Sequence, residues 1–158
     1  MYFKSFEIRW GDLDANGHLG NADYIAFMSH TRMSFFTEQG LSLENMRESG
    51  LGPIALYEHV YYFKEINISD EIRVSLEIVG FTTDTQFIKM EHNFYNQHGQ
   101  NLAFSEILFS WIDLKTRKLG RLSPDLQRKI MSFPKAARFK ILEKSDIRKS
   151  GMRPRDLS

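Results

Sequence analysis

The sequence predicts a single α+β domain in which one apolar helix lies against an antiparallel sheet. Three observations lead to this fold class. A stretch near the N-terminus alternates between apolar and polar residues, a largely apolar helix-like segment follows, and four strand-like runs separated by turn residues come next. The chain has 158 residues, and 42% of them are hydrophobic, which is enough for one sizeable core.

The first two elements are a strand over residues 2–10 and a helix over residues 22–39. In the strand, Phe6, Ile8 and Trp10 share one face, because successive side chains of a strand point to opposite faces. The helix ends before Gly40. Its buried side is predicted to hold six residues at helical spacing, namely Ala22, Ile25, Met28, Ser29, Arg32 and Phe36.

Four strands are predicted after a loop over 41–53 that includes a short helical turn. Turn residues separate the strand ranges, which are 54–65, 70–82, 85–97 and 101–114. The apolar face of the third run consists of Ile88, Met90, His92 and Phe94. This pattern predicts that His92 is a core histidine. Both faces of the fourth run are apolar, which predicts a strand covered on both sides.

The chain is predicted to end in a basic tail, residues 135–158, after a domain that spans residues 1–134. A short helix over 124–131, opened by Ser123 and Pro124, precedes the tail. The tail holds eight Lys or Arg and three Asp or Glu, a net charge of +5 that leaves −4 for the remainder. Such a segment is either a solvated end or a surface that attracts phosphate groups.

Several protein classes are excluded or disfavoured by composition. The absence of cysteine excludes a disulfide, a zinc–thiolate site and a thiol nucleophile. The first residues lack the apolar stretch of a signal peptide, and no apolar run is long enough to span a bilayer, so a cytoplasmic protein is expected. Motifs for phosphate loops, dinucleotides, zinc proteases and serine hydrolase elbows are missing. A nucleic-acid partner is not expected, because the basic tail lacks an aromatic stripe.

The stretch GDLDANGHLGNAD, residues 11–23, has two interpretations. Its oxygen-bearing residues, glycine and apolar anchor fall at EF-hand positions, namely Asp12, Asp14, Asn16, Gly17, Leu19 and Asp23. However, an EF-hand needs a helix before its loop, and the preceding residues alternate like a strand. The second interpretation is a catalytic Asp and His placed just before a helix.

The same stretch resembles the active-site segment of the hotdog-fold thioesterases, the 4-hydroxybenzoyl-CoA and acyl-CoA thioesterase family. The motif Asp-x-Asp-x-x-Gly-His runs from Asp12 to His18, and Tyr24 follows at the start of the helix. The resemblance spans about residues 5–130 and includes Arg32 and the segments VYYFKEINISDEIRV and WIDLKTRKLGRLSPDL. The run from Asp14 to His18 is also similar to the Asp-x-Asn-x-His run of acyl-ACP thioesterases.

This resemblance implies a hotdog fold, an antiparallel sheet wrapped around one long central helix. It also implies hydrolysis of an acyl-CoA, or a related acyl thioester, to a free acid and a thiol. No metal or other cofactor is expected, and coenzyme A enters only as part of the substrate. The family pairs two copies along one sheet edge, so a homodimer or homotetramer is expected.

The resemblance assigns roles to individual residues. Asp14 is the catalytic carboxylate, either as a nucleophile or as a base acting on water. The backbone N–H of Asn21, at the helix N-terminus, polarises the thioester carbonyl. His18 and Asn16 position water or substrate. Residues expected at the substrate are Tyr24, Gly20 and Glu65, with Glu58 as an alternative to Glu65 for a further acidic residue.

Two other functions remain open. A non-catalytic module could bind acyl-CoA or acyl carrier protein, although Asp14 argues against this, since a buried carboxylate is costly without a chemical use. A hotdog dehydratase would use a His on a Pro-Gly-rich loop, and the loop around His18 lacks prolines. Aromatic residues on both faces of one strand, Tyr61, Tyr62 and Phe63, favour an oligomer or an acyl pocket.

Overall fold

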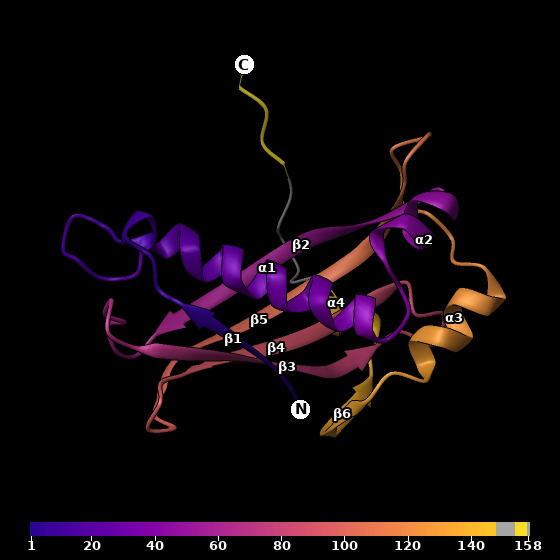
Figure 1. Cartoon of the computed structure of the whole chain (residues 1–158). Helices are drawn as coiled ribbons and strands as arrows, with labels where there is room; N and C mark the ends of the chain where they lie inside the picture. The colour runs from indigo at the N-terminus through magenta and orange to yellow at the C-terminus, as the bar shows by residue number, and fades with distance from the viewer. Residues whose placement is uncertain (148–153, 158) are drawn as a thin grey trace.

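The computed structural model describes residues 1–147 and 154–157. Within these residues a six-stranded sheet carries helix α1 across one face (Figure 1). The strands are β1 (Tyr2–Glu7), β2 (Leu51–Tyr62), β3 (Glu71–Phe81), β4 (Phe87–Tyr95), β5 (Asn101–Asp113) and β6 (Lys135–Ile141). The helices are the 3-10 helix η1 (Trp10–Asp12), α1 (Asn21–Glu38), α2 (Leu43–Glu48), α3 (Pro124–Met131) and α4 (Lys144–Ile147).

The sheet has the strand order β1-β3-β4-β5-β2, and neighbours along this path are antiparallel. Strand β6 pairs with β3 in parallel, past the end of β1: Tyr2 lies opposite Leu76, and Lys135 lies opposite Ile78. The predicted α+β class with an antiparallel sheet is confirmed. Strand β6 was not predicted, since it falls in the segment expected to be a tail.

Helix α1 lies within one residue of its predicted range at each end. Gly40 has φ +73°, a conformation that favours glycine and ends the helix. The predicted buried side is partly wrong, since Ile25 is 37% exposed. The helix instead packs against β1 and β3 with a face rotated toward its aromatic residues. The buried residues of α1 are Tyr24, Phe27, Met28, Thr31, Phe35 and Phe36.

The N-terminal strand is shorter than its alternating pattern predicted. It ends at Glu7, and Trp10 lies in η1 with 82% of its surface exposed, so the prediction that Trp10 shares a strand face with Phe6 and Ile8 is wrong. The reason is a competing turn. The Asp12 carboxylate accepts hydrogen bonds from the backbone and guanidinium of Arg9, at 2.9 Å for the backbone N–H, and draws the chain out of the sheet.

The middle of the sheet follows the predicted pattern closely. Ile88, Met90, His92 and Phe94 are all fully buried on one face of β4, which confirms the core histidine. Strand β5 lies between β4 and β2, as an interior strand with apolar residues on both faces should. Strand β2 begins and ends earlier than predicted. Because it ends at Tyr62, residues 63–65 leave the sheet and turn toward the start of α1.

The basic residues of the predicted tail are partly used within the fold. Arg138 pairs with Glu77 at 3.1 Å and with Glu91, and Lys140 pairs with Asp146. Arg148, Lys149 and Arg153 lie outside the described residues. Among the residues described, no helix combines the length and the apolar composition that crossing a membrane requires.

Candidate active site

The loop between η1 and α1 folds back on itself around Asp14. The Asp14 backbone N–H donates to the His18 carbonyl at 2.8 Å, and Leu13 bridges Leu19. Gly17 has φ +74° and makes the reversal possible. The Asp14 carboxylate accepts hydrogen bonds from the backbone N–H groups of Asn16 at 2.8 Å and His18 at 3.2 Å. Two backbone hydrogen bonds of the loop therefore hold one oxygen of the Asp14 carboxylate in place.

Those N–H groups lower the pKa of Asp14 below its ordinary value, with His18 as the larger cause and Asn16 as the second. Asp14 is ionised at neutral pH, and its second carboxylate oxygen accepts no hydrogen bond from the loop. The side chain is exposed in the single chain. The argument that Asp14 is a costly buried carboxylate is therefore wrong for this chain taken alone.

A cavity of about 350 Å³ joins this loop to the start of α1 and to the residues that follow β2. It brings together two segments that are far apart in the sequence, residues 14–24 and residues 62–65. Its lining consists of Asp14, His18, Leu19, Asn21, Tyr24, Tyr62, Phe63, Lys64 and Glu65. Five of the predicted site residues therefore share one cavity: Asp14, His18, Asn21, Tyr24 and Glu65.

The N-terminus of α1 opens into this cavity. Asn21 is the first residue of the helix, and Gly20 is the N-cap. Within the described part of the chain, the backbone N–H groups of Asn21 and Ala22 have no acceptor. Free N–H groups at a helix start carry partial positive charge. They can therefore donate to an anionic oxygen that develops within the cavity.

The further acidic residue at the cavity is Glu65. Its Oε2 lies 3.1 Å from Nε2 of His18, so the two side chains form a pair at the rim. Glu58 lies within β2 and faces α1 further along the helix, where its Oε1 lies 2.8 Å from Nη1 of Arg32. Of the two candidates for the further acidic residue, Glu65 lies at the cavity and Glu58 does not.

Two predicted residues contribute through their backbone. Asn16 is exposed, its side chain lies outside the cavity lining, and its N–H braces Asp14. Gly20 also lies outside the lining, and its N–H donates to the Asp12 carbonyl at 2.8 Å. A Cβ atom at Gly20 would lie 2.9 Å from Oδ2 of Asp23. Gly20 thus lets the loop pass close to the first turn of α1.

Tyr24 forms the inner end of the cavity. Its ring is in edge-to-face contact with Tyr62, at 5.0 Å between centroids, and lies at the same distance from Phe94. Burial raises the pKa of Tyr24 to about 12, and the nearby Tyr62 and Asp14 add to the shift. The hydroxyl is therefore a permanent hydrogen-bond donor at ordinary pH.

Sequence reasoning missed Lys64 and Leu19 in this lining. Leu19 is buried beneath the loop, and Lys64 brings a positive charge beside two carboxylates. The position of Lys64 next to Glu65, just after a strand, was the available signal. The sequence also did not predict the polar contact between α1 and the sheet, where Nη1 of Arg32 lies 3.2 Å from Nε2 of the buried His92.

The calcium interpretation of the loop is not favoured by the fold. Strand β1 and η1 precede the loop, where an EF-hand would have a helix. Across residues 1–147 and 154–157, no three His, Cys, Asp or Glu side chains are grouped as a metal site would require. The Asp14 carboxylate is instead used to brace the turn.

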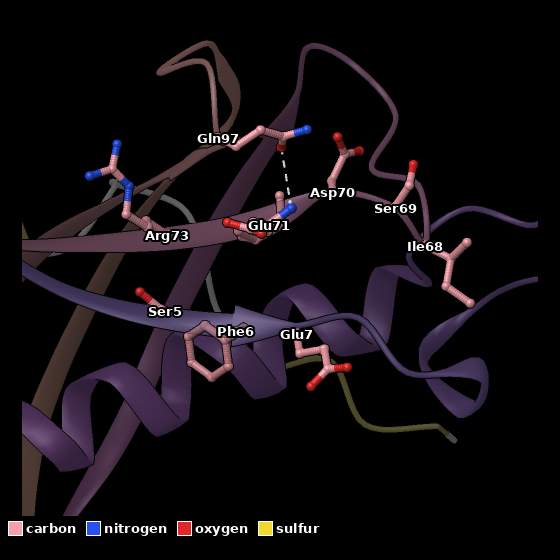
Figure 2. A pocket seen from close by; sticks show the side chains of 10 residues that line it. Ser5, Phe6, Glu7, Ile68, Ser69, Asp70, Glu71, Arg73 and Gln97 are labelled. Carbon is pink, nitrogen blue, oxygen red and sulfur yellow. Dashed lines mark hydrogen bonds between the residues drawn. The ribbon is translucent and has the colours of Figure 1, made fainter.

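A larger cavity of about 710 Å³ lies over the ends of β1 and β3 (Figure 2). It contains none of the predicted site residues. Its charged lining consists of Glu7, Asp70, Glu71 and Arg73, with Gln97 accepting a hydrogen bond from the Glu71 N–H at 3.2 Å. It lacks a carboxylate beside free helix N–H groups, so the smaller cavity has the chemistry that an active site needs.

Comparison with known proteins identifies the family of this chain. A model of the Thioesterase-like superfamily matches residues 8–130, and the chain belongs to this superfamily. The resemblance to hotdog-fold thioesterases is confirmed. A betainyl-CoA thioesterase from Pseudomonas aeruginosa is 24% identical over 127 residues, which cover 80% of this chain and 79% of that protein.

Two further relatives are similar over most of the chain. The L-carnitine dehydrogenase/betainyl-CoA thioesterase of Agrobacterium fabrum is 21% identical over 121 residues. These cover 77% of this chain, and the chain spans only 24% of the length of that relative. A Staphylococcus aureus protein determined in complex with CoA has a TM-score of 0.73 and 21% identity, covering 82% of this chain and 80% of that one.

Proposed function

We propose that this protein hydrolyses an acyl-CoA or a closely related acyl thioester to a free acid and a thiol. The observation that carries the proposal is the cavity that joins the ionised Asp14 carboxylate to the free N–H of Asn21. A thioesterase needs a carboxylate or activated water on one side of the carbonyl and a hydrogen-bond donor at its oxygen. The family membership and the named thioesterase relatives support the same reaction.

In the proposed reaction, water or the Asp14 carboxylate attacks the thioester carbonyl carbon. Electron density moves to the carbonyl oxygen, which receives a hydrogen bond from the Asn21 N–H. When the carbonyl re-forms, the C–S bond breaks, and the sulfur leaves as a thiolate that takes up a proton. With Asp14 as nucleophile, a second attack by water releases the acid from the enzyme.

The His18–Glu65 pair is proposed to orient the attacking water. Glu65 fixes Nε2 of His18 at 3.1 Å, and the remaining ring nitrogen can contact water within the cavity. Asn16 supports the step indirectly, because its N–H holds one oxygen of Asp14 in place. These groups need no metal or prosthetic group for the reaction, and coenzyme A is part of the substrate.

The substrate-binding role of the lining follows from its chemistry. Lys64 is the cation of the cavity lining, and it is proposed to meet the coenzyme phosphates together with basic side chains of the tail. Aromatic faces of Tyr62 and Phe63 beside two carboxylates suit a trimethylammonium group. Betainyl-CoA, named for two relatives, is therefore one of the first substrates to test.

A second candidate function is a binding module for acyl-CoA or acyl carrier protein. The observation that favours it is the exposure of Asp14, because an exposed carboxylate costs a non-catalytic protein little.

For both candidate functions, we propose that the protein assembles as a homodimer or homotetramer in the cytoplasm. Strand β2 is an edge of the sheet, and a second copy would cover the exposed aromatic residues at its end, which are Tyr61, Tyr62 and Phe63. The sheet would then wrap α1 as in the family.

The test is thiol release from short, long, aromatic and betainyl acyl-CoA thioesters and from acyl carrier protein thioesters. Wild type is compared with Asp14→Asn, and Glu7→Gln serves as a control, since Glu7 is an exposed acid outside the cavity. We expect hydrolysis of one class, with kcat reduced at least about a hundredfold in Asp14→Asn and unchanged in Glu7→Gln. Tight binding without turnover of any thioester would instead establish the binding module.

A further inference from the structure

We infer that the Tyr24–Tyr62 pair closes the inner end of the cavity and restricts the enzyme to short acyl groups. This inference rests on the proposed function. It concerns the residues that set the acyl length, which the reaction itself does not specify.

The inner end of the cavity is packed shut. Tyr24 is only 4% exposed, because Tyr62 contacts one side of its ring and Phe94 lies against another. Behind Tyr24, Met28 and Phe94 are fully buried in a continuous apolar cluster. Protein interiors are close-packed, so an apolar chain cannot extend into this cluster unless a side chain is removed.

A second barrier lies deeper along α1. Nη1 of Arg32 is 2.8 Å from Oε1 of Glu58 and 3.2 Å from Nε2 of His92, and both charged side chains are 12% exposed. Arg32 follows Tyr24 by eight residues, which is about 12 Å along a helix. An apolar chain pressed against this ion pair would replace its polar contacts with hydrocarbon, which is unfavourable. The Arg32–Glu58 ion pair thus limits the length of the acyl chain even when the Tyr24–Tyr62 pair is broken.

Tyr62 is the residue to change, because it is 53% exposed and its truncation leaves the buried core intact. Tyr62→Ala removes the ring that holds Tyr24, whereas Tyr62→Phe keeps the ring and removes only the hydroxyl. Tyr61→Ala is the matched control. Tyr61 is adjacent, is 56% exposed and lies outside the cavity lining.

The experiment measures kcat/KM for acetyl-, butyryl-, octanoyl- and palmitoyl-CoA with each variant, after gel filtration has shown equal oligomeric states. Wild type, Tyr62→Phe and Tyr61→Ala are expected to prefer the acetyl or butyryl thioester to octanoyl-CoA by at least about tenfold. Tyr62→Ala is expected to raise the octanoyl-to-acetyl ratio by at least about tenfold. Palmitoyl-CoA should remain a poor substrate of all four, because of the ion pair.

Two results would overturn the inference while leaving the proposed function in place. One is a wild-type preference for octanoyl- or palmitoyl-CoA, and the other is the same shift in Tyr61→Ala as in Tyr62→Ala. Absence of turnover with these thioesters, and with the aromatic, betainyl and acyl carrier protein thioesters of the first test, would count against the proposed function. The same series is then measured as equilibrium binding by calorimetry, where the same order of lengths supports the inference and tighter binding of long chains overturns it.

Discussion

The buried His92 should make the protein lose stability in mild acid. His92 is fully buried, its Nδ1 lies 2.8 Å from the Ser75 carbonyl oxygen, and its Nε2 lies close to the Arg32 guanidinium. Burial lowers the pKa of His92 to about 3, and Arg32 adds to the shift, against an ordinary value of 6.5. The folded protein therefore holds this ring neutral, with its proton on Nδ1.

The size of the effect follows from this difference in pKa. In the unfolded chain His92 takes up a proton below about pH 6.5, whereas in the folded chain it does not until about pH 3. The contribution of His92 to the stability of the folded state is therefore complete above about pH 6.5, and it is lost progressively as the pH falls toward 3. Each pH unit in this window costs about 1.4 kcal/mol, so the loss between pH 7 and pH 5 is about 2 kcal/mol.

The assay compares the free energy of unfolding in urea at pH 7, 6 and 5 for wild type and His92→Gln, at one protein concentration. Glutamine can still donate to the Ser75 carbonyl and accept from Arg32, but it does not titrate. We expect the variant to lose about 2 kcal/mol less than wild type over this range. His98→Gln is the control, since His98 is exposed, and it should follow wild type. Equal losses in wild type and His92→Gln would refute the reasoning.

Two further predictions concern stability, and both are measured by urea unfolding at pH 7. Glu58→Gln should cost about 3 kcal/mol, because it leaves the partly buried Arg32 without its counter-charge; Arg128→Gln, which breaks an exposed pair with Asp125, should cost less than about 1 kcal/mol, and equal costs would contradict this account. Gly80→Ala should cost about 2 kcal/mol, because its Cβ would lie 2.9 Å from a backbone oxygen of β6. Gly11→Ala, with open space around it, should change stability by less than about 0.5 kcal/mol, and a larger loss there than at Gly80 would contradict the steric explanation.

The sequence predicted elements whose periodicity agreed with their burial. The alternation of β4 gave the right face, including His92, because each inward position is a residue that can be buried there. Gly40 and Ser123 marked helix boundaries correctly, since their local chemistry suffices: Gly40 adopts positive φ, and Ser123 accepts a hydrogen bond from the Leu126 N–H at 3.3 Å.

Errors arose where the outcome depended on a contact that the hydrophobic pattern does not contain. Trp10 continued the alternating pattern, but the Arg9–Asp12 turn removed it from the sheet. The buried face of α1 depends on which strands it packs against, which spacing alone does not give. Strand β6 carries many charges and looks like a tail, because its pairing partner β3 lies more than fifty residues earlier.

The spacing along the chain predicted which candidate residues lie together, but not how they are arranged. The spacing from Asp14 to Asn21 pointed to a carboxylate beside a helix N-terminus, and both line one cavity. The choice between Glu58 and Glu65 required the point at which β2 ends. Because the strand stops at Tyr62, Glu65 can turn back to His18, whereas Glu58 remains in the strand and faces α1.

The pairing of both β1 and β6 with β3 has a consequence for synthesis on the ribosome. One edge of β3 is completed by the first residues of the chain along one part and by residues 135–141 along the next. Contacts between such distant segments form slowly, since a long loop must close first. From Ile78 to Phe81, this edge of β3 therefore waits without a partner strand until residues 135–141 have been made, although β4 already pairs with the other edge. A chain shortened to residue 134 would keep that open edge permanently, and we expect it to aggregate.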